Sequence, residues 1–146
     1  MIALRLVRLI ETHSDELVEG LLQKFQSSDK TREMAKVPVS ELRERAYEIL
    51  KNLGDWLLYK KESDIQNRYR EIGMRRASQQ VSLSDYCWGV VFTKEHIWEF
   101  LQREGMLRGP IEIYGELELV RLLDHFFDHA LCYASEGYEA AQASIA

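Results

Sequence analysis

The stretch Ser82–Leu101, SLSDYCWGVVFTKEHIWEFL, is the most apolar part of this 146-residue chain, and we expect the other helices to pack around it. At about 100° per residue, a helix through this stretch places one set of apolar side chains on a single stripe. That core stripe consists of Leu83, Tyr86, Val90, Ile97 and Leu101. Trp88 and Phe92 fall on the opposite side, where an ordinary surface helix is polar. The sequence therefore predicts a central helix with contacts on both faces.

Charge and cysteine content exclude several classes of function. The net charge of −5 is mild and the acidic residues are spread along the chain, so no basic stripe is available for nucleic acid or an anionic membrane. Cys87 and Cys132 form neither a C-x-x-C motif nor a secreted disulfide framework, which favours a reducing, cytoplasmic setting. Arg5 and Arg8 interrupt the apolar N-terminus well short of a signal peptide or membrane span.

The apolar spacing predicts one all-α domain, residues 1–146, of five or six helices, because no stretch alternates like a strand. Residues 2–26 form either one bent helix or two helices that part near Thr12, and residues 27–39 read as a loop with one helical turn at most. Ser40 is expected to cap a helix that ends near residue 60. A Ser63–Gln66 capping box is expected to start the next one.

Capping signals also bound the last two helices. Ser82 with Asp85 caps the central helix and Gly105 ends it, and Gly109 with Pro110 turns the chain into a helix over about residues 112–141. We expect glycines inside helices to mark close helix contacts, above all at Gly73 and Gly89, because each costs about 0.5–1 kcal/mol relative to alanine.

The last helix carries more apolar surface than one core needs. Its core stripe consists of Leu117, Val120, Leu123, Phe127, Ala130 and Ala134, and a second apolar set consists of Leu119, Leu122, Phe126 and Tyr133. Either another helix of the same chain covers the second set, or a second copy does. We favour an isologous homodimer, in which the last two helices of each subunit form a four-helix bundle. The interface is then predicted to comprise Trp88, Phe92, Leu119, Leu122, Phe126 and Tyr133.

One charge falls on an otherwise apolar helix face. Ile65, Tyr69 and Ile72 share the inward side of their helix, and Arg76 takes the next place. The arginine either extends to the surface on its methylene groups or pairs with an internal acid or carbonyl. We favour the first because the position is near the helix end.

The segment YREIGMRR, residues 69–76, and the segment VSLSDY, residues 81–86, together resemble the region of bacterial sensor globins that carries the proximal haem histidine. Arg76 stands where that family has histidine, and Gln80-Val81 replaces its Gly-Leu. An arginine stays protonated and cannot ligate iron. The resemblance implies a globin-like domain without haem, and Tyr69, Arg76 and Tyr86 would line the former haem pocket as a candidate signal pocket.

A wider pattern is similar to the RsbRD-type N-terminal domain of RsbT co-antagonist proteins. It comprises LIETH at residues 9–13, LGDWLL at 53–58, KEHIWEFL at 94–101 and LLDHFFD at 122–128. The resemblance implies a non-haem globin that pairs as a homodimer and serves as a non-enzymatic input module in stress signalling. Such domains usually precede a STAS domain, and related ones precede histidine kinases. An interaction module that senses nothing is the alternative.

The histidines are weak candidates for metal or haem ligands. His125 and His129 are four residues apart, a spacing that helical metal sites use. Asp124 and Asp128 lie nearby, but no third ligand can be identified in the sequence, so solvated or interfacial histidines are expected rather than a metal site. His13 or His96 could replace the lost haem ligand, but we expect no cofactor. No nucleophile elbow, phosphate loop or zinc-protease motif is present in the sequence, and no enzyme activity is expected.

Overall fold

Eight helices make up the part of the chain that the computed structural model describes, residues 2–104 and 110–145, with side chains for 3–104 and 114–144. Gly105 and Gly109, the predicted helix end and turn, lie outside these residues. The six α-helices are α1 (Ile2–Thr12), α2 (Ser14–Ser27), α3 (Val39–Leu50), α4 (Glu62–Ser78), α5 (Leu83–Glu104) and α6 (Pro110–Ile145). A 3-10 helix, η1 (Asp29–Lys36), and a π-helix, η2 (Asp55–Tyr59), complete the set.

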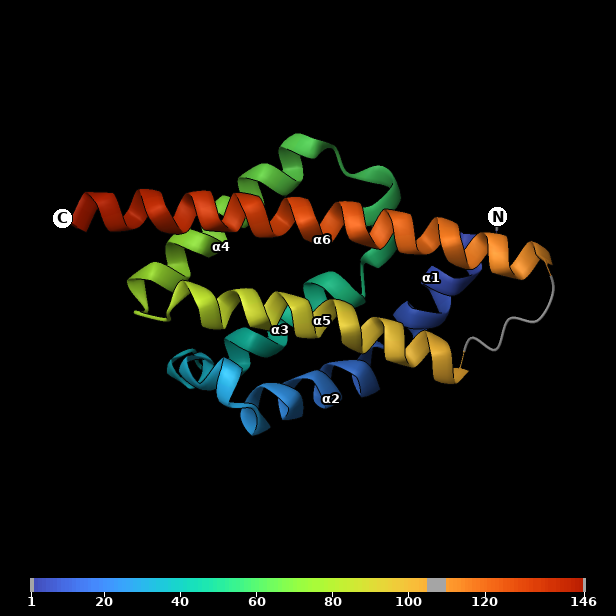
Figure 1. The fold of residues 1–146 in the computed structure, drawn as a ribbon, viewed down its shortest axis with the longest axis horizontal. Coiled ribbons are helices and arrows are strands. Elements are labelled where there is room, and N and C mark those ends of the chain that lie inside the picture. The colour runs from blue at the N-terminus through green and yellow to red at the C-terminus, as the bar shows by residue number, and fades with distance from the viewer. Residues whose placement is uncertain (1, 105–109, 146) are drawn as a thin grey trace.

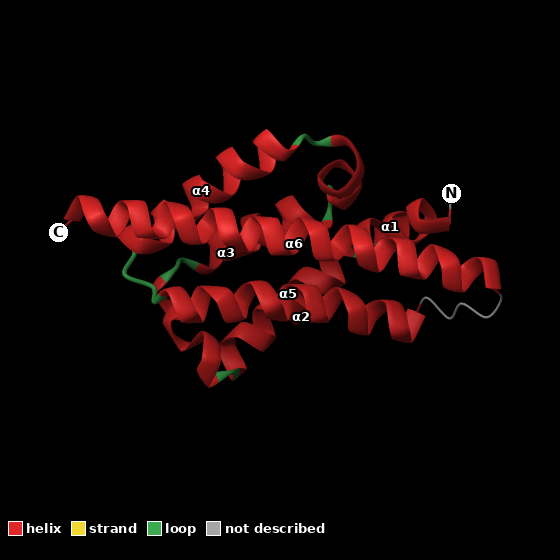
Figure 2. Cartoon of the chain, turned by 45° about the horizontal axis from the view of Figure 1, so that its top comes forward, coloured by secondary structure: helices red, strands yellow, loops and turns green. Residues whose placement is uncertain are grey.

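The described residues contain no strand, as predicted (Figure 2). The first helical region is two helices, because the chain breaks at His13. The stretch predicted as a loop with one helical turn instead forms the eight-residue η1, so that part of the prediction was wrong.

The longest helix, α6, organises the arrangement. Its 36 residues span about 54 Å at ~1.5 Å per residue. It runs along the whole molecule, antiparallel to α5, while α2 and η1 pack against α5 (Figure 1). The other contacts of α6 are with α1, η2 and α4. Because these neighbours approach from different directions, α6 has to be apolar around much of its circumference.

That arrangement corrects the predicted faces of α6. Leu123, Phe127, Ala130 and Ala134 are buried as expected, but Leu117 is 63% exposed. Leu119 and Phe126, predicted to face a second copy, are instead buried within the single chain at 0% and 1% exposure. Two of the six residues assigned to a dimer interface therefore belong to the core of the single chain.

Two of the three predicted N-caps are wrong. Pro38, not Ser40, precedes α3, and no side chain caps it. Lys61 precedes α4, and its backbone N–H donates to the Asp64 carboxylate at 2.9 Å, in place of a bond to Gln66. Ser82 does cap α5, since its hydroxyl accepts from the Asp85 N–H at 3.2 Å.

The crossing of α4 and α6 is a backbone-to-backbone contact. A Cβ on Gly73 would lie 1.9 Å from the Ala134 carbonyl oxygen, and one on Gly137 would lie 2.1 Å from that of Arg70. The close approach predicted at Gly73 is therefore confirmed. At Gly89 it is wrong, because the nearest atom to a Cβ there is the Met34 methyl at 3.7 Å, an ordinary contact.

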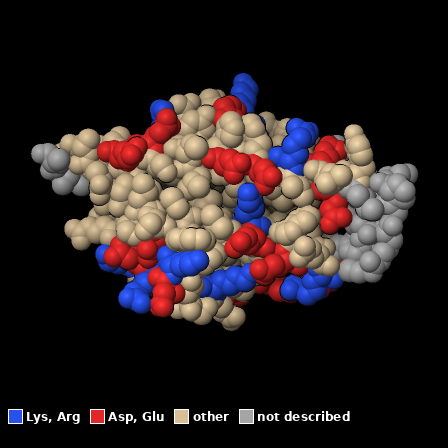
Figure 3. All heavy atoms as spheres, viewed as in Figure 1, with Lys and Arg blue, Asp and Glu red and all other residues tan. Residues whose placement is uncertain are grey.

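The surface mixes both signs of charge. Figure 3 shows acidic and basic groups interspersed over the face in view, consistent with the mild net charge of −5. Among the described helices, none is both long and apolar enough to cross a bilayer.

Candidate functional site

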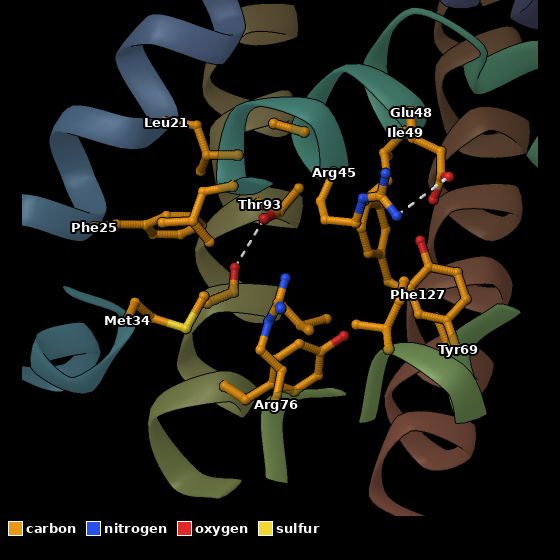
Figure 4. A pocket seen from close by; sticks show the side chains of 17 residues that line it. Leu21, Phe25, Met34, Arg45, Glu48, Ile49, Tyr69, Arg76, Thr93 and Phe127 are labelled. Carbon is orange, nitrogen blue, oxygen red and sulfur yellow. Dashed lines mark hydrogen bonds and ion pairs between the residues drawn. The ribbon is translucent and has the colours of Figure 1, made fainter. Parts of the chain in front are cut away.

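The three residues assigned to a signal pocket, Tyr69, Arg76 and Tyr86, line the same cavity, which is partly open and has a volume of about 70 Å³ (Figure 4). Tyr69 and Arg76 come from α4 and Tyr86 from α5. Leu21, Phe25 and Met34 are among the residues that close the remaining walls, and Gly89 and Thr93 contribute from α5. Figure 4 shows the Arg76 guanidinium between Phe25 and Met34 on one side and Arg45 and Tyr69 on the other. The pocket is therefore mostly apolar with a cation inside it.

Arg76 does not extend to the surface, so the favoured prediction was wrong. Its side chain is 2% exposed and donates from Nη1 to the Glu41 carboxylate of α3 and, at 2.9 Å, to Gln79 Oε1. The alternative, pairing with an internal acid, is the one that the structure adopts. A buried guanidinium without a carboxylate would cost several kcal/mol, about 3–5 by the usual range. Glu41 is thus a site residue that the sequence pattern alone did not reveal.

The Glu41 carboxylate accepts hydrogen bonds from three residues. Arg75 Nη2 donates to its Oε1 at 2.9 Å, and Gln79 Nε2 lies 3.2 Å from its Oε2, in addition to the Arg76 bond. Burial alone would raise the pKa of this carboxyl, but the hydrogen bonds from Arg75, Arg76 and Gln79 outweigh it and lower the pKa to about 2. The carboxylate therefore stays ionised at every physiological pH.

Three polar atoms at the pocket are buried and have no hydrogen-bond partner among the described residues: Arg76 Nε, Arg45 Nε and the Tyr69 hydroxyl. Two are N–H donors and the third can donate. Leaving such a group unpaired costs roughly 1–3 kcal/mol. All three belong to residues that line the same pocket.

Both pocket tyrosines are held neutral. Burial is the main cause that raises the pKa of Tyr69 and of Tyr86 far above the ordinary value near 10. Tyr69 also packs edge-on against Trp56 and Phe126, with ring centroids 5.9 and 5.7 Å apart. These contacts fix the position of the Tyr69 ring, so its hydroxyl is a preoriented donor at the wall of the pocket.

The cavity is far too small for a porphyrin as the chain is packed here. A volume of about 70 Å³ is roughly half of the ~150 Å³ that an engineered apolar cavity needs to hold benzene. His13 and His96 do not line it: their ring nitrogens lie 2.9 Å from the backbone carbonyls of Leu9 and Leu17. Burial also lowers the pKa of His96.

The turn between α4 and α5 contains a non-glycine residue with a positive φ. Gln80 has φ +60°, the left-handed conformation that favours glycine. It stands at the position where the sensor-globin family has Gly. A side chain at this φ carries backbone strain that glycine would avoid.

The other residues assigned to a dimer interface differ in exposure and in their contacts. Trp88 is 38% exposed, lies beside Phe92 and has the Lys30 ammonium 3.8 Å from its ring centroid. Tyr133 is half-buried and donates from its hydroxyl to Glu62 of α4. Leu122 is also half-buried.

The fold and the pocket define an all-helical domain built around a buried, carboxylate-paired arginine. The chain matches the family described as the RsbT co-antagonist protein rsbRD N-terminal domain over residues 14–146, and it belongs to that family. Membership implies a role in stressosome-type stress signalling with partners such as RsbT, and it suggests a regulatory, non-catalytic domain. A search of curated proteins found no match, and a search of solved structures found none either.

Proposed function

We propose that this domain is a sensory input module of a stressosome-type regulator, in which a small ligand with acceptor oxygens binds beside Arg76. The observation that carries the proposal is the set of three unpaired polar atoms, from Arg45, Tyr69 and Arg76, around one apolar cavity. A ligand of a few heavy atoms, such as a small carboxylate or oxyanion, would satisfy donors that the described protein atoms leave unpaired.

The α4–α6 crossing supplies the route for the signal. Gly73 lies one turn before Arg76 on α4 and touches the α6 backbone at Ala134. A ligand that repositions the guanidinium would move α4, and with it the C-terminal half of α6. The ligand has to bind two arrangements of these helices unequally for any such coupling to exist. We propose that the fold is globin-like and that the pocket beside Arg76 is a reduced form of a haem pocket.

The signal would be read by a homodimer that pairs through α5 and α6. Leu117 is 63% exposed on α6, and Trp98 and Val120 line a groove of about 200 Å³ between the two helices. Trp88 is a further exposed aromatic residue on α5. The proposed pairing thus uses exposed apolar residues of the two helices that the resemblance assigns to it, without Leu119 and Phe126. A second copy presenting the same residues would bury them.

Ligand binding can be tested by thermal unfolding with formate, acetate, nitrate and bicarbonate as probes. At least one is expected to raise the midpoint saturably in the wild type and not in Arg76→Met. Arg75→Met is the matched control, because its neighbouring guanidinium binds the same Glu41 but is 58% exposed. A saturable response equal in all three proteins, or none in the wild type, would contradict a ligand at Arg76.

Pairing can be tested by light scattering. The wild type is expected to be a dimer, and Leu117→Glu and Trp88→Glu should each weaken it by about 30-fold or more if the side chain is an interface hot spot worth ~2 kcal/mol. Tyr59→Glu, an exposed aromatic on η2, should leave the mass unchanged. A wild-type monomer at high concentration would remove pairing from the proposal.

A plain interaction module with a fully structural ion pair is the second candidate. Arg76 already has a carboxylate partner in Glu41, and the cavity is small. Under this alternative Arg76→Met costs stability, because Glu41 loses one of its partners, but signalling by the full regulator is unchanged in a variant that folds. Loss of signalling in an Arg76→Met variant that folds would favour the sensor.

A further inference from the structure

Two histidines of α6 and one glutamate of α4 converge on the surface at the start of α4. His125 Nε2 lies 3.2 Å from Glu62 Oε1, and His129 Nδ1 lies 2.5 Å from Glu62 Oε2. The two imidazole rings stack, with centroids 3.9 Å apart and planes inclined by 29°. Both rings thus present a nitrogen to the same carboxylate.

The third partner was not visible in the sequence, because Glu62 is 63 residues from His125 in the chain. The neighbouring Asp124 and Asp128 instead face Lys94, with oxygens 2.9 and 3.8 Å from its Nζ. The three ligand atoms of Glu62, His125 and His129 lie within 4.8 Å of one another. A tetrahedral site with bonds of about 2.0–2.1 Å needs separations of roughly 3.4 Å, which half-exposed side chains can reach by small rotations.

We propose that Glu62, His125 and His129 form a binding site for a divalent transition ion of the Zn²⁺ type. Two imidazoles and one carboxylate are a donor set that this ion prefers, and three protein ligands leave a position open for water or a further ligand. The side chains of Glu62, His125 and His129 are 44%, 56% and 42% exposed, so an ion can enter from solvent. In the absence of an ion, hydrogen bonds hold the same groups together.

A neighbouring residue orients the carboxylate. The Tyr133 hydroxyl donates to Glu62 Oε2 at 2.6 Å. Partners of this kind fix the direction of a ligand's lone pairs and typically change metal affinity by about 10–100-fold when removed. Tyr133, assigned from the sequence to a dimer interface, therefore acquires a supporting role at this site.

A bound ion would join the first residue of α4 to the middle of α6. Arg76 lies at the opposite end of α4, and the metal site shares no residue with the pocket. The ion would thus brace the α4–α6 pair independently of whatever occupies the pocket. Failure of the metal site would leave the pocket proposal unaffected.

The test is equilibrium dialysis of the untagged chain against ZnCl₂, with the bound metal measured by elemental analysis. One Zn²⁺ per chain is expected for the wild type. Glu62→Gln and His129→Ala should each weaken binding at least about tenfold, and Tyr133→Phe by less than the loss of a direct ligand. Glu136→Gln is the matched control, because this exposed α6 carboxylate bonds Arg70 outside the cluster.

Two further measurements identify the ligands. Zn²⁺ is expected to raise the unfolding midpoint of the wild type but not of Glu62→Gln, since an ion that binds only the folded state stabilises it. Co²⁺ should give d–d absorption without a thiolate charge-transfer band, and Cys132→Ser should bind Zn²⁺ as the wild type does. No stoichiometric uptake, or uptake that survives Glu62→Gln combined with His129→Ala, would overturn the proposal.

Discussion

The two ends of α4 hold the same electrostatic motif in opposite surroundings. At one end Glu41 accepts hydrogen bonds from Arg75, Arg76 and Gln79, and at the other Glu62 is hydrogen-bonded to Tyr133, His129 and His125. Hydrogen bonding lowers the pKa of both carboxyls to about 2. However, Arg76 is 2% exposed, whereas both histidines are about half exposed. Burial, and not the number of donors, is thus expected to decide which cluster supports the fold and which one can take the proposed ion.

The largest difference between the two ends should appear on removing each carboxylate. Glu41→Ala leaves Arg76 buried without a charge partner and should cost about 3 kcal/mol of unfolding free energy, at the lower end for a broken buried pair because Glu41 is itself partly solvated. Glu62→Gln should cost less than about 1 kcal/mol, as exposed pairs do. Urea unfolding of both variants checks this, and equal losses of unfolding free energy would show that burial does not distinguish the two carboxylates.

The glycine contact between the two ends gives the next largest effect. Gly73→Ala forces a Cβ against the Ala134 carbonyl and should destabilise by roughly 1–3 kcal/mol. Gly89→Ala is the matched control, because a Cβ there meets only ordinary contacts and alanine favours the helix by about 0.5–1 kcal/mol. Chemical denaturation of the pair should move the midpoints in opposite directions. A neutral Gly73→Ala would mean that the helices separate easily.

Acid titration tests whether the Glu41 carboxylate contributes to stability. The folded-state pKa of Glu41, about 2, is below its ordinary value of 4.5, so its contribution to stability is fully present above about pH 4.5 and is lost as pH falls toward 2. The Glu41→Gln variant should therefore show a shallower loss of stability between these values than the wild type. Unfolding free energies measured across this range test it; identical slopes would show that Glu41 is not the group responsible.

The smallest effect concerns the strained turn beside the buried cluster. Gln80→Gly should stabilise the chain by up to about 1 kcal/mol, because the left-handed φ of +60° costs a side-chain residue but not glycine. The greater flexibility of glycine in the unfolded chain offsets part of this gain. A thermal or urea midpoint that falls would show that the Gln80 side chain makes a compensating contact.

The family resemblance grouped the pocket residues, but it did not identify their partners. Tyr69, Arg76 and Tyr86 could be grouped because the resemblance to sensor globins assigns them to the former haem pocket, and the structure places all three at one pocket. The partners Glu41 and Glu62 were missed because each lies on another helix, 35 and 63 residues away from the residue it binds. A helical wheel describes one element, and such pairings depend on how elements cross. One signal was available. An arginine on an apolar stripe that does not reach the surface needs an acid nearby, and Glu41 stands one residue before Leu42, a buried residue of α3.

The faces of α6 were mispredicted for a related reason. A wheel assumes one core direction for the whole helix, but α6 meets α1, η2, α4 and α5 along its length. Leu119 and Phe126 are therefore buried although they lie off the principal stripe, and Leu117 is exposed although it lies on it. Cap positions failed at α3 and α4 because several residues near each start could serve.

The glycine crossing also limits how α4 and α6 can move. Side chains between two helices can change rotamer and so absorb a shift of one helix without passing it on. At Gly73 and Gly137 no side chain separates the helices, because the main chain of α4 contacts the main chain of α6 directly. Under the proposed mechanism, a displacement that begins at Arg76 would therefore be passed to α6 directly through the main chain.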